Sequence, residues 1–185
     1  MGTGTSRSIA LAVVLALAGC GGQSASRSSS WLTGRAAPAA WPTMTIARGA
    51  TISYPPGWHR VHGDTGTASA MLLGRGQRVI GYLNLTPRQG AESQAAWARF
   101  RVDHNREEGE GSVRTLRAAS GIRFLTGRGS CVEDSYTTSA ETRYVEIACL
   151  VTGRRSTFVT VGASSPAQWS RSAAVIERAI EGVRG

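Results

Sequence analysis

The sequence predicts an α+β domain in which one antiparallel sheet is flanked by two helices. Three observations predict it. Short β-prone runs separated by turn residues fill residues 43–86, a second β block fills residues 113–161, and a helical segment follows each block. The resulting order is strands, helix, strands, helix. With 185 residues, 41% of them hydrophobic, the chain is long enough for a single domain with a substantial core.

The N-terminal segment precedes this domain and has the features of a bacterial export signal. Arg7 is followed by an apolar run, Ile9 to Ala18, which is shorter than the roughly 20 residues that a membrane span requires. The run ends in Leu17-Ala18-Gly19-Cys20, the pattern of a lipoprotein processing site. Small side chains there admit a membrane peptidase, and the cysteine thiol receives a diacylglyceryl group. We therefore expect a signal peptide at residues 1–19, lipidation of Cys20 and a location outside the cytoplasm, lipid-anchored to the cell membrane.

Two other interpretations of this segment are weaker. A buried N-terminal helix would be ended by Gly19-Cys20-Gly21-Gly22. Residues 1–6 also match the N-myristoylation pattern, which is less detailed than the lipobox. After the cysteine, Gly21 to Ser30 is small and polar, and residues 31–40 read as irregular chain. The sequence thus predicts a flexible tether at residues 20–40 and one domain at 41–184.

The first β block contains several short strands and one strong turn. Pro56-Gly57, within Tyr54-Pro55-Pro56-Gly57-Trp58, suits the centre of a type II turn. A hairpin is expected around residues 74–77, and its second strand is central because apolar residues occupy both faces. The expected strands are residues 43–48, 50–54, 58–61, 69–73 and 78–86.

Two helices are predicted. Residues 91–107 lack Gly and Pro, and Trp97, Phe100 and His104 form the expected apolar stripe, with His104 at its wet edge. The second helix starts at Ser165-Pro166, where a capping serine precedes a proline at the first helical position. Its expected apolar stripe comprises Trp169, Ala173, Ile176, Ile180 and Val183.

The second β block carries two cysteines that predict a strand register. Its expected strands are residues 113–118, 122–126, 131–137, 143–151 and 156–161. Once Cys20 is assigned to lipid, Cys131 and Cys149 are an even pair in an oxidising compartment, so a disulfide is the default. A two-cysteine metal site is the alternative, but no ligand partners lie close in sequence. If the cysteines face each other across an antiparallel pair, the hairpin centres on Ala140, in a small polar turn.

The same register places Asp134 opposite Glu146 and Tyr136 opposite Tyr144. Two facing carboxylates repel each other unless an arginine, a cation or a shared proton intervenes, so this pair is the nearest approach to a paired-carboxylate site. We favour the interpretation that the two acids form an exposed pair splayed into water beside Arg143.

Composition excludes some chemistry and suggests a class of partner. The chain carries 21 basic residues against 12 acids, a net charge of +9, and every basic residue is arginine. Mechanisms that need lysine are therefore excluded. Excess positive charge suggests attraction to anionic lipid or acidic wall polymer, whereas nucleic acid is a poor guess for an exported protein. The arginines are, however, scattered along the sequence and form no stripe, which favours an ordinary solvated basic surface.

A search for catalytic groups finds only a weak metal hypothesis. His59 and His62 could be joined by Asp64 if the chain turns at Gly63, as in a metal-assisted hydrolase. On a strand, however, the spacing of the two histidines directs them to opposite faces. No Gly-x-Ser-x-Gly elbow is present. We assign no catalytic, cofactor-binding or metal residue and expect no cofactor.

The element order, together with the turn Tyr54-Pro55-Pro56-Gly57-Trp58, resembles the PsbP-like superfamily. In that group a Tyr-Pro-x-x-Trp turn follows the first strands, and an antiparallel sheet lies between helices. The LpqN-type lipoproteins of actinobacteria, which join a lipobox to this domain, are the most similar branch. The Cys131–Cys149 pair is not part of the general family pattern.

The resemblance implies an accessory, binding or assembly factor and supplies no active-site residues. We therefore expect a non-catalytic, monomeric envelope protein that binds a protein partner or an amphiphilic ligand, such as a lipid or glycolipid, between sheet and helix. The alternatives are the metal-assisted hydrolase and a basic module that docks on anionic lipid or cell-wall polymer.

Overall fold

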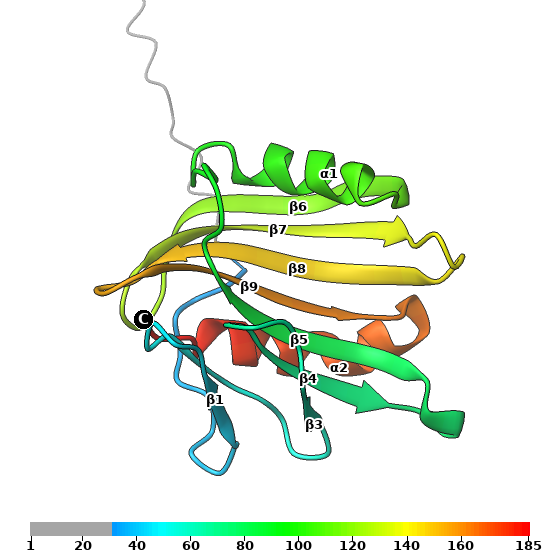
Figure 1. The fold of residues 1–185 in the computed structure, drawn as a ribbon, viewed down its shortest axis with the longest axis horizontal. Helices are drawn as coiled ribbons and strands as arrows, with labels where there is room; N and C mark the ends of the chain where they lie inside the picture. The colour runs from blue at the N-terminus through cyan, green and yellow to red at the C-terminus, as the bar shows by residue number, and fades with distance from the viewer. Residues whose placement is uncertain (1–30) are drawn as a thin grey trace, which may run out of the picture.

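The computed structural model describes residues 31–185, in which one long antiparallel sheet is combined with two α-helices (Figure 1). The signal peptide predicted at residues 1–19 and the lipidation predicted at Cys20 lie outside the described residues. In the main sheet the strand order is β3-β4-β5-β9-β8-β7-β6, and β1 and β2 form a separate pair. The strands are β1 (Thr43–Thr45), β2 (Thr51–Ser53), β3 (His59–Val61), β4 (Ala68–Leu73), β5 (Val79–Pro87), β6 (Gly111–Arg123), β7 (Arg128–Thr137), β8 (Arg143–Thr152) and β9 (Thr157–Ser164).

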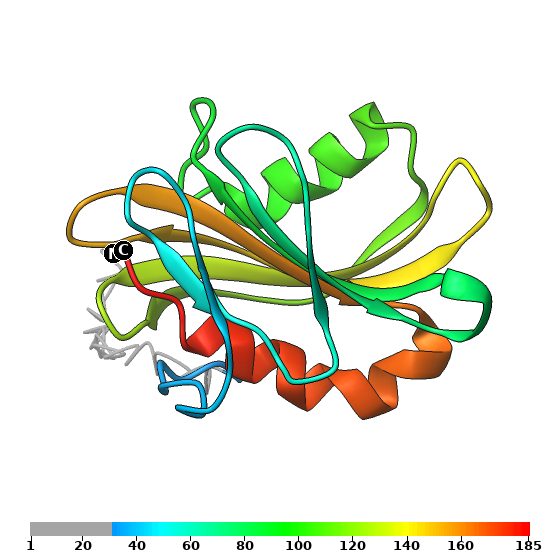
Figure 2. The same ribbon diagram turned by 60° about the horizontal axis from the view of Figure 1, so that its bottom comes forward.

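The two helices lie on opposite sides of the sheet (Figure 2). Helix α1 (Trp97–Glu107) packs against β6, β7 and β8, whereas α2 (Pro166–Glu181) packs against β9, β8, β5 and β2. A short 3₁₀ turn, η1 (Arg75–Gln77), joins β4 to β5. The predicted α+β class, with an antiparallel sheet between two helices, is therefore confirmed.

Most of the expected elements form close to the expected positions, with two differences. Residues 113–118 and 122–126, which we expected as separate strands, belong largely to the single long strand β6, whose pairing with β7 contains register shifts. Helix α1 begins at Trp97 instead of residue 91. The residues before it form turns, because the Glu92 carboxylate accepts the Gly90 N–H and the Ser93 hydroxyl accepts the Ala96 N–H.

The predicted hairpin register is confirmed. Strands β7 and β8 pair with Cys131 opposite Cys149, Asp134 opposite Glu146, and Tyr136 opposite Tyr144. A disulfide joins the two cysteines, with an S–S distance of 2.04 Å. Both cysteines belong to the main hydrophobic cluster, so the disulfide crosses the two strands inside the core.

The main core lies between the sheet and α2. Leu83 and Leu85 of β5 meet Ile176 and Ile180 of α2, and all four side chains are fully buried. Gly162 of β9 allows the close approach, because a Cβ there would lie 2.5 Å from Cγ2 of Ile176. Of the expected α2 stripe, Ile176, Ile180 and Val183 are buried and Trp169 is partly buried.

The packed body includes residues upstream of the expected start near Trp41. Leu32 is 1% exposed and belongs to the main core. The Glu181 carboxylate accepts the Thr33 N–H at 2.8 Å and pairs with the Arg35 guanidinium at 3.0 Å. The sequence did not predict these contacts, because residues 32–35 belong to no helix or strand and have no hydrophobic periodicity. None of the helices within residues 31–185 is long and apolar enough to cross a membrane.

Candidate functional site

The buried face of α1 differs from the apolar stripe that the sequence suggested. Trp97, Arg101 and Asn105 face the sheet, at intervals of four residues. Phe100 is instead 36% exposed, and its ring stacks on that of His104, with 5.8 Å between the ring centroids. The expected stripe of Trp97, Phe100 and His104 is therefore wrong beyond Trp97. Arg101 and Asn105 are buried in place of Phe100 because the sheet beneath α1 offers a hydrogen-bonding partner to Arg101, which in turn donates to Asn105.

Those partners centre on Glu146 of β8, which is 1% exposed. Its Oε1 accepts Nη2 of Arg101 at 2.5 Å, and Nη2 also donates to Oδ1 of Asn105 at 3.0 Å. Its Oε2 accepts the Tyr82 hydroxyl at 2.8 Å and the Tyr136 hydroxyl at 3.1 Å. We call the set Tyr82, Arg101, Asp134, Tyr136 and Glu146 the acid cluster.

Asp134 is the one acid-cluster member without a hydrogen-bond partner among the described residues. It is 0% exposed, and neither carboxylate oxygen is hydrogen-bonded. Burial and the neighbouring Glu146 raise the pKa of Asp134 to about 8, although Arg101 acts in the opposite direction. The carboxyl of Asp134 is therefore mostly protonated at neutral pH, which relieves its repulsion from Glu146.

The expectation that Asp134 and Glu146 splay into water beside Arg143 is wrong. The two acids are buried beneath α1, and the arginine that pairs with Glu146 is Arg101 of α1, not Arg143. The same environment acts on the tyrosines. Burial and the nearby Glu146 raise the pKa of Tyr82 and of Tyr136 well above the usual value, so both remain hydrogen-bond donors.

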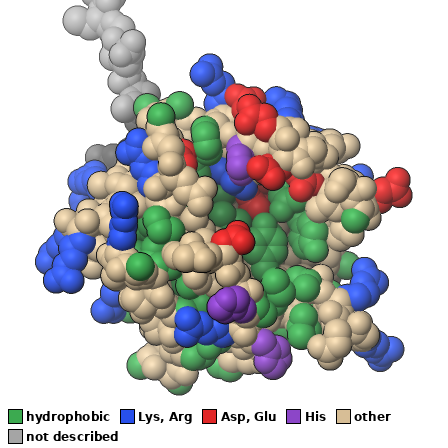
Figure 3. Space-filling view, in the orientation of Figure 1, with side chains coloured by type: hydrophobic (Ala, Val, Ile, Leu, Met, Phe, Trp, Pro, Cys, Tyr) green, Lys and Arg blue, Asp and Glu red, His purple; other side chains and the backbone are tan. Residues whose placement is uncertain are grey.

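Beside this cluster, helix α1 and strands β5 and β9 enclose a hollow of about 290 Å³, which we call the α1 cleft. Its apolar lining comes from Trp97, Val159 and Val161, and its charged lining from Asp64, Glu92, Arg101 and His104. Figure 3 shows hydrophobic side chains open to view in the middle of this face, with acidic side chains and a histidine above them, near α1. Arg101 links the α1 cleft to the acid cluster. The remaining lining residues are Thr67, Asn84, Thr86, Pro87 and Gln89.

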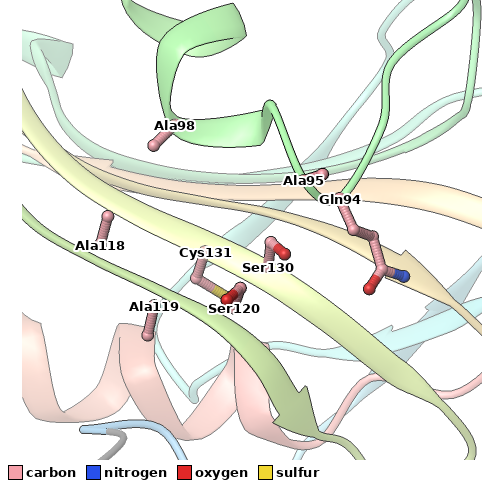
Figure 4. A pocket seen from close by; sticks show the side chains of 8 residues that line it. All are labelled: Gln94, Ala95, Ala98, Ala118, Ala119, Ser120, Ser130 and Cys131. Atoms are coloured by element: carbon pink, nitrogen blue, oxygen red, sulfur yellow. The ribbon is translucent and has the colours of Figure 1, made fainter. Parts of the chain in front are cut away.

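A second hollow, of about 350 Å³, lies where α1 starts (Figure 4). Small side chains line it, namely Ala95 and Ala98 near the start of α1, Ala118, Ala119 and Ser120 of β6, and Ser130 of β7, together with Gln94 and Cys131. None of these residues carries a charge, and Cys131 is held in the disulfide. This hollow therefore has no charged group with which to bind or orient a ligand, and the α1 cleft is the stronger candidate site.

The metal hypothesis gains no support from the structure. His59, His62 and Asp64 are all exposed, and of the three only Asp64 lines the α1 cleft. Within residues 31–185, no group of three or more His, Cys, Asp or Glu side chains is arranged to hold a metal ion. The expectation that a turn at Gly63 would bring these three residues together is therefore not met.

Comparisons with known proteins identify a fold and no sequence family. No family model and no curated protein matches the chain. Among solved structures, cyanobacterial PsbP (CyanoP) from Synechocystis superposes with a TM-score of 0.58 at 13% identity, covering 82% of this chain and 94% of that one. The fold is PsbP-like. The expectation drawn from the Tyr54–Trp58 turn and the element order is confirmed at this level.

Two further structures share this PsbP-like architecture. The Ran-binding protein Mog1p of Saccharomyces cerevisiae has a TM-score of 0.50 at 10% identity, covering 76% of this chain and 87% of that one. LpqN of Mycobacterium tuberculosis, described as involved in cell envelope biogenesis, has a TM-score of 0.50 at 9% identity, covering 78% and 84%. At such identities the likeness establishes the fold alone, and membership of the LpqN-type branch stays a prediction.

Sequence reasoning missed most of the candidate site. Arg101 and Asn105 were passed over because charged and amide side chains are normally placed on a helix's solvent face. The signal available was their spacing, since Trp97, Arg101 and Asn105 recur every fourth residue and so share one face. Val159 and Val161 were expected only as strand residues, and nothing local distinguishes a covered strand face from an open one.

Proposed function

We propose that this protein is a non-catalytic, lipid-anchored accessory protein of the bacterial envelope that binds a partner protein through the α1 cleft. The lipid anchor at Cys20 is inferred from the lipobox alone. The cleft supplies the binding site, and the observation that carries this proposal is its combination of apolar and charged walls. Such a surface can bury an apolar side chain while pairing with a nearby charge.

The chemistry of the α1 cleft favours binding over catalysis. No serine or cysteine that could act as a nucleophile lines the cleft. Its titratable lining residues are Asp64, Glu92, Arg101 and His104. Arg101 is already committed to Glu146 and Asn105. Hydrogen bonds from backbone N–H groups and from Arg88 lower the pKa of Glu92 despite its partial desolvation, which keeps it ionised. A fixed negative charge beside an apolar floor fits a partner's basic or amphipathic segment.

The fold neighbours support a partner protein over a small ligand. Mog1p, described as a Ran-binding protein, uses the same fold, and LpqN is described as acting in cell envelope biogenesis. A volume of about 290 Å³ lies at the lower end of the range for small-molecule sites. It is sufficient for one or two side chains of a protein partner. An amphiphile, the second candidate, would need the open sheet face next to the cleft as well.

The anchor is tested in cells by metabolic labelling with an alkyne-bearing fatty acid. We expect the label on the wild-type protein and none on Cys20→Ser. The Cys20→Ser protein should either keep its signal peptide or leave the membrane fraction. Label on the Cys20→Ser protein, or an unmodified N-terminus beginning at Met1 in the wild type, would refute lipidation at this residue.

The binding role is tested by site-specific photo-crosslinking in intact cells. A photoreactive residue at Val159, in the cleft, is compared with one at Leu116, which is 50% exposed and lies outside it. We expect a discrete protein adduct from position 159 alone, which Glu92→Gln weakens by removing the fixed negative charge of the cleft. A low-mass adduct would favour the amphiphile, and identical adducts from both positions would overturn the assignment of the cleft.

A further inference from the structure

A hollow of about 560 Å³, separate from the α1 cleft, is lined by four arginines. Arg48 comes from the β1–β2 turn, Arg88 follows β5, and Arg154 and Arg155 occupy the β8–β9 turn. Segments far apart in the sequence thus bring guanidinium groups to one end of the sheet. In Figure 3 the left edge, where Figure 1 places the β8–β9 turn, carries many arginine side chains. We call Arg48, Arg88, Arg154 and Arg155 the arginine end.

Three of the four arginine side chains at the arginine end have no paired acid among the described residues, although the Arg154 backbone N–H donates to an oxygen of Gly185 at 3.0 Å. No acidic residue lines the hollow. Within residues 31–185, the side chains of Arg48, Arg154 and Arg155 form neither an ion pair nor a hydrogen bond. Arg88 is the exception, since its Nε donates to the Gly90 carbonyl at 2.9 Å and lies 3.4 Å from a Glu92 oxygen. Guanidinium groups that converge without counter-charges form a site for an anion.

A second observation at the same hollow points to a missing partner. The hydroxyl of Ser156, another lining residue, is buried and has no hydrogen-bond partner among the described residues. A buried hydroxyl without a partner is unfavourable, and a bound oxyanion would accept its hydrogen bond. Phosphate matches this set best, because its oxygens accept paired N–H groups from arginine forks in a fixed geometry.

Gly34, three residues after the start of the described chain, is hydrogen-bonded to the same end of the sheet. The Gly34 N–H donates to the Arg123 carbonyl at 2.9 Å, at the close of β6. The neighbouring Arg128, which opens β7, pairs with Thr152 of β8 just before the β8–β9 turn. Residues 21–30 can span at most about 36 Å when fully extended. A tether of this length would keep the domain within reach of the membrane surface, and the choice of the end that faces the membrane is left to the surface of the domain itself.

We propose that the arginine end binds the phosphate headgroups of anionic phospholipids in the membrane that holds the lipid anchor. This inference rests on the proposed anchoring for the closeness of the domain to the membrane. It makes the anchored domain a two-point attachment, in which the lipid limits the distance and the arginines set the orientation. The α1 cleft, which is lined by other residues, would then remain free for a partner.

The test measures co-sedimentation of the full chain with vesicles. All proteins carry Cys20→Ser, so that acylation does not contribute, and pure phosphatidylcholine vesicles report the binding that does not depend on lipid charge. We expect binding to rise when phosphatidylglycerol is included and to fall with added salt. The triple variant R48Q/R154Q/R155Q should bind the anionic vesicles about tenfold or more weakly, since each arginine at an anionic surface strengthens attachment severalfold.

The matched control is R60Q/R75Q/R78Q, which removes the same charge from exposed arginines outside the hollow. Equal loss in both triple variants would reduce the effect to net charge and overturn the site. Binding of a soluble glycerol-phosphate polymer without binding of anionic vesicles would replace the lipid surface by a wall polymer and also overturn the proposal. Failure of Cys20 labelling in cells would refute the anchor and leave the vesicle result unchanged, so the two failures are distinguishable.

Discussion

Arg101 of α1 and Glu146 of β8 form a buried ion pair, with 2.5 Å between Nη2 and Oε1. It is the main polar connection between the helix and the sheet beneath it. The indole of Trp97 adds a hydrogen bond to the Ala148 carbonyl at 2.8 Å one turn earlier in the helix. Together these two contacts determine where α1 lies and hence the position of one wall of the α1 cleft.

Replacing Arg101 by methionine should destabilise the domain by about 3–5 kcal/mol, since one partner of a buried pair is left without compensation. Urea unfolding followed by tryptophan fluorescence measures the loss. In the double variant R101M/E146Q the uncompensated charge is removed, and much of the stability should return. A double variant that is no more stable than R101M would show that packing, and not charge, is what Arg101 contributes.

Replacing Asp134 by asparagine should stabilise the protein at pH 8 and above, by about 2 kcal/mol, because the amide is neutral at every pH. The folded-state pKa of Asp134 is raised to about 8 from an ordinary 3.8. The stability associated with its protonated form is therefore fully present below pH 3.8 and is lost as the pH rises through about 8.

The measurement is the free energy of unfolding as a function of pH. Between pH 4 and 8 the wild-type protein should lose stability relative to Asp134→Asn, since the folded state holds the proton that the unfolded state releases. Parallel curves for the two proteins across this range would contradict the assignment of a protonated Asp134. Arg101, Glu146 and Glu133 are the charged groups that act on Asp134, and all three are unchanged in the variant.

Removing the disulfide with C131A/C149A should lower stability by about 3 kcal/mol, given the sequence separation of 18 residues between the cysteines. The fold itself should persist, because both positions lie in a continuous hydrophobic cluster that alanine can enter. Thermal unfolding of the oxidised, reduced and double-alanine proteins gives the comparison. Equal midpoints for oxidised and reduced protein would show that the disulfide adds nothing to stability.

Gly162→Ala should destabilise the contact between α2 and the sheet by about 1–3 kcal/mol through overpacking. The new Cβ would lie 2.5 Å from Cγ2 of Ile176 and 2.9 Å from Cδ2 of Leu83. Combining it with Ile176→Leu, whose Cβ carries no Cγ2 methyl, removes the contacting atom and should recover part of the loss. If the double variant lost the full sum of the two single effects, the close contact at Gly162 would not be the cause.

Local patterns were sufficient for the β7–β8 hairpin. Two cysteines and a small polar turn fixed a register that the structure reproduces residue for residue between positions 131 and 149. The turn at Pro56-Gly57 also followed from residue type, and Gly57 adopts the positive φ of 84° that glycine tolerates. Both features depend on neighbours in sequence, which is why a single sequence predicts them.

The sequence by itself determined the α+β class, the order of strands and helices, the hairpin register with its disulfide pairing, and the strongly basic composition. Only the tertiary structure decided which face of α1 is buried, that Arg101 pairs with Glu146 beside the buried Asp134, and that Arg48, Arg88, Arg154 and Arg155 line one hollow. The physical reason is range. Turn geometry and hairpin pairing act between residues close along the chain, whereas burial, ion pairing, shared hollows and the pairing of β5 with β9 depend on which distant segments the fold brings together.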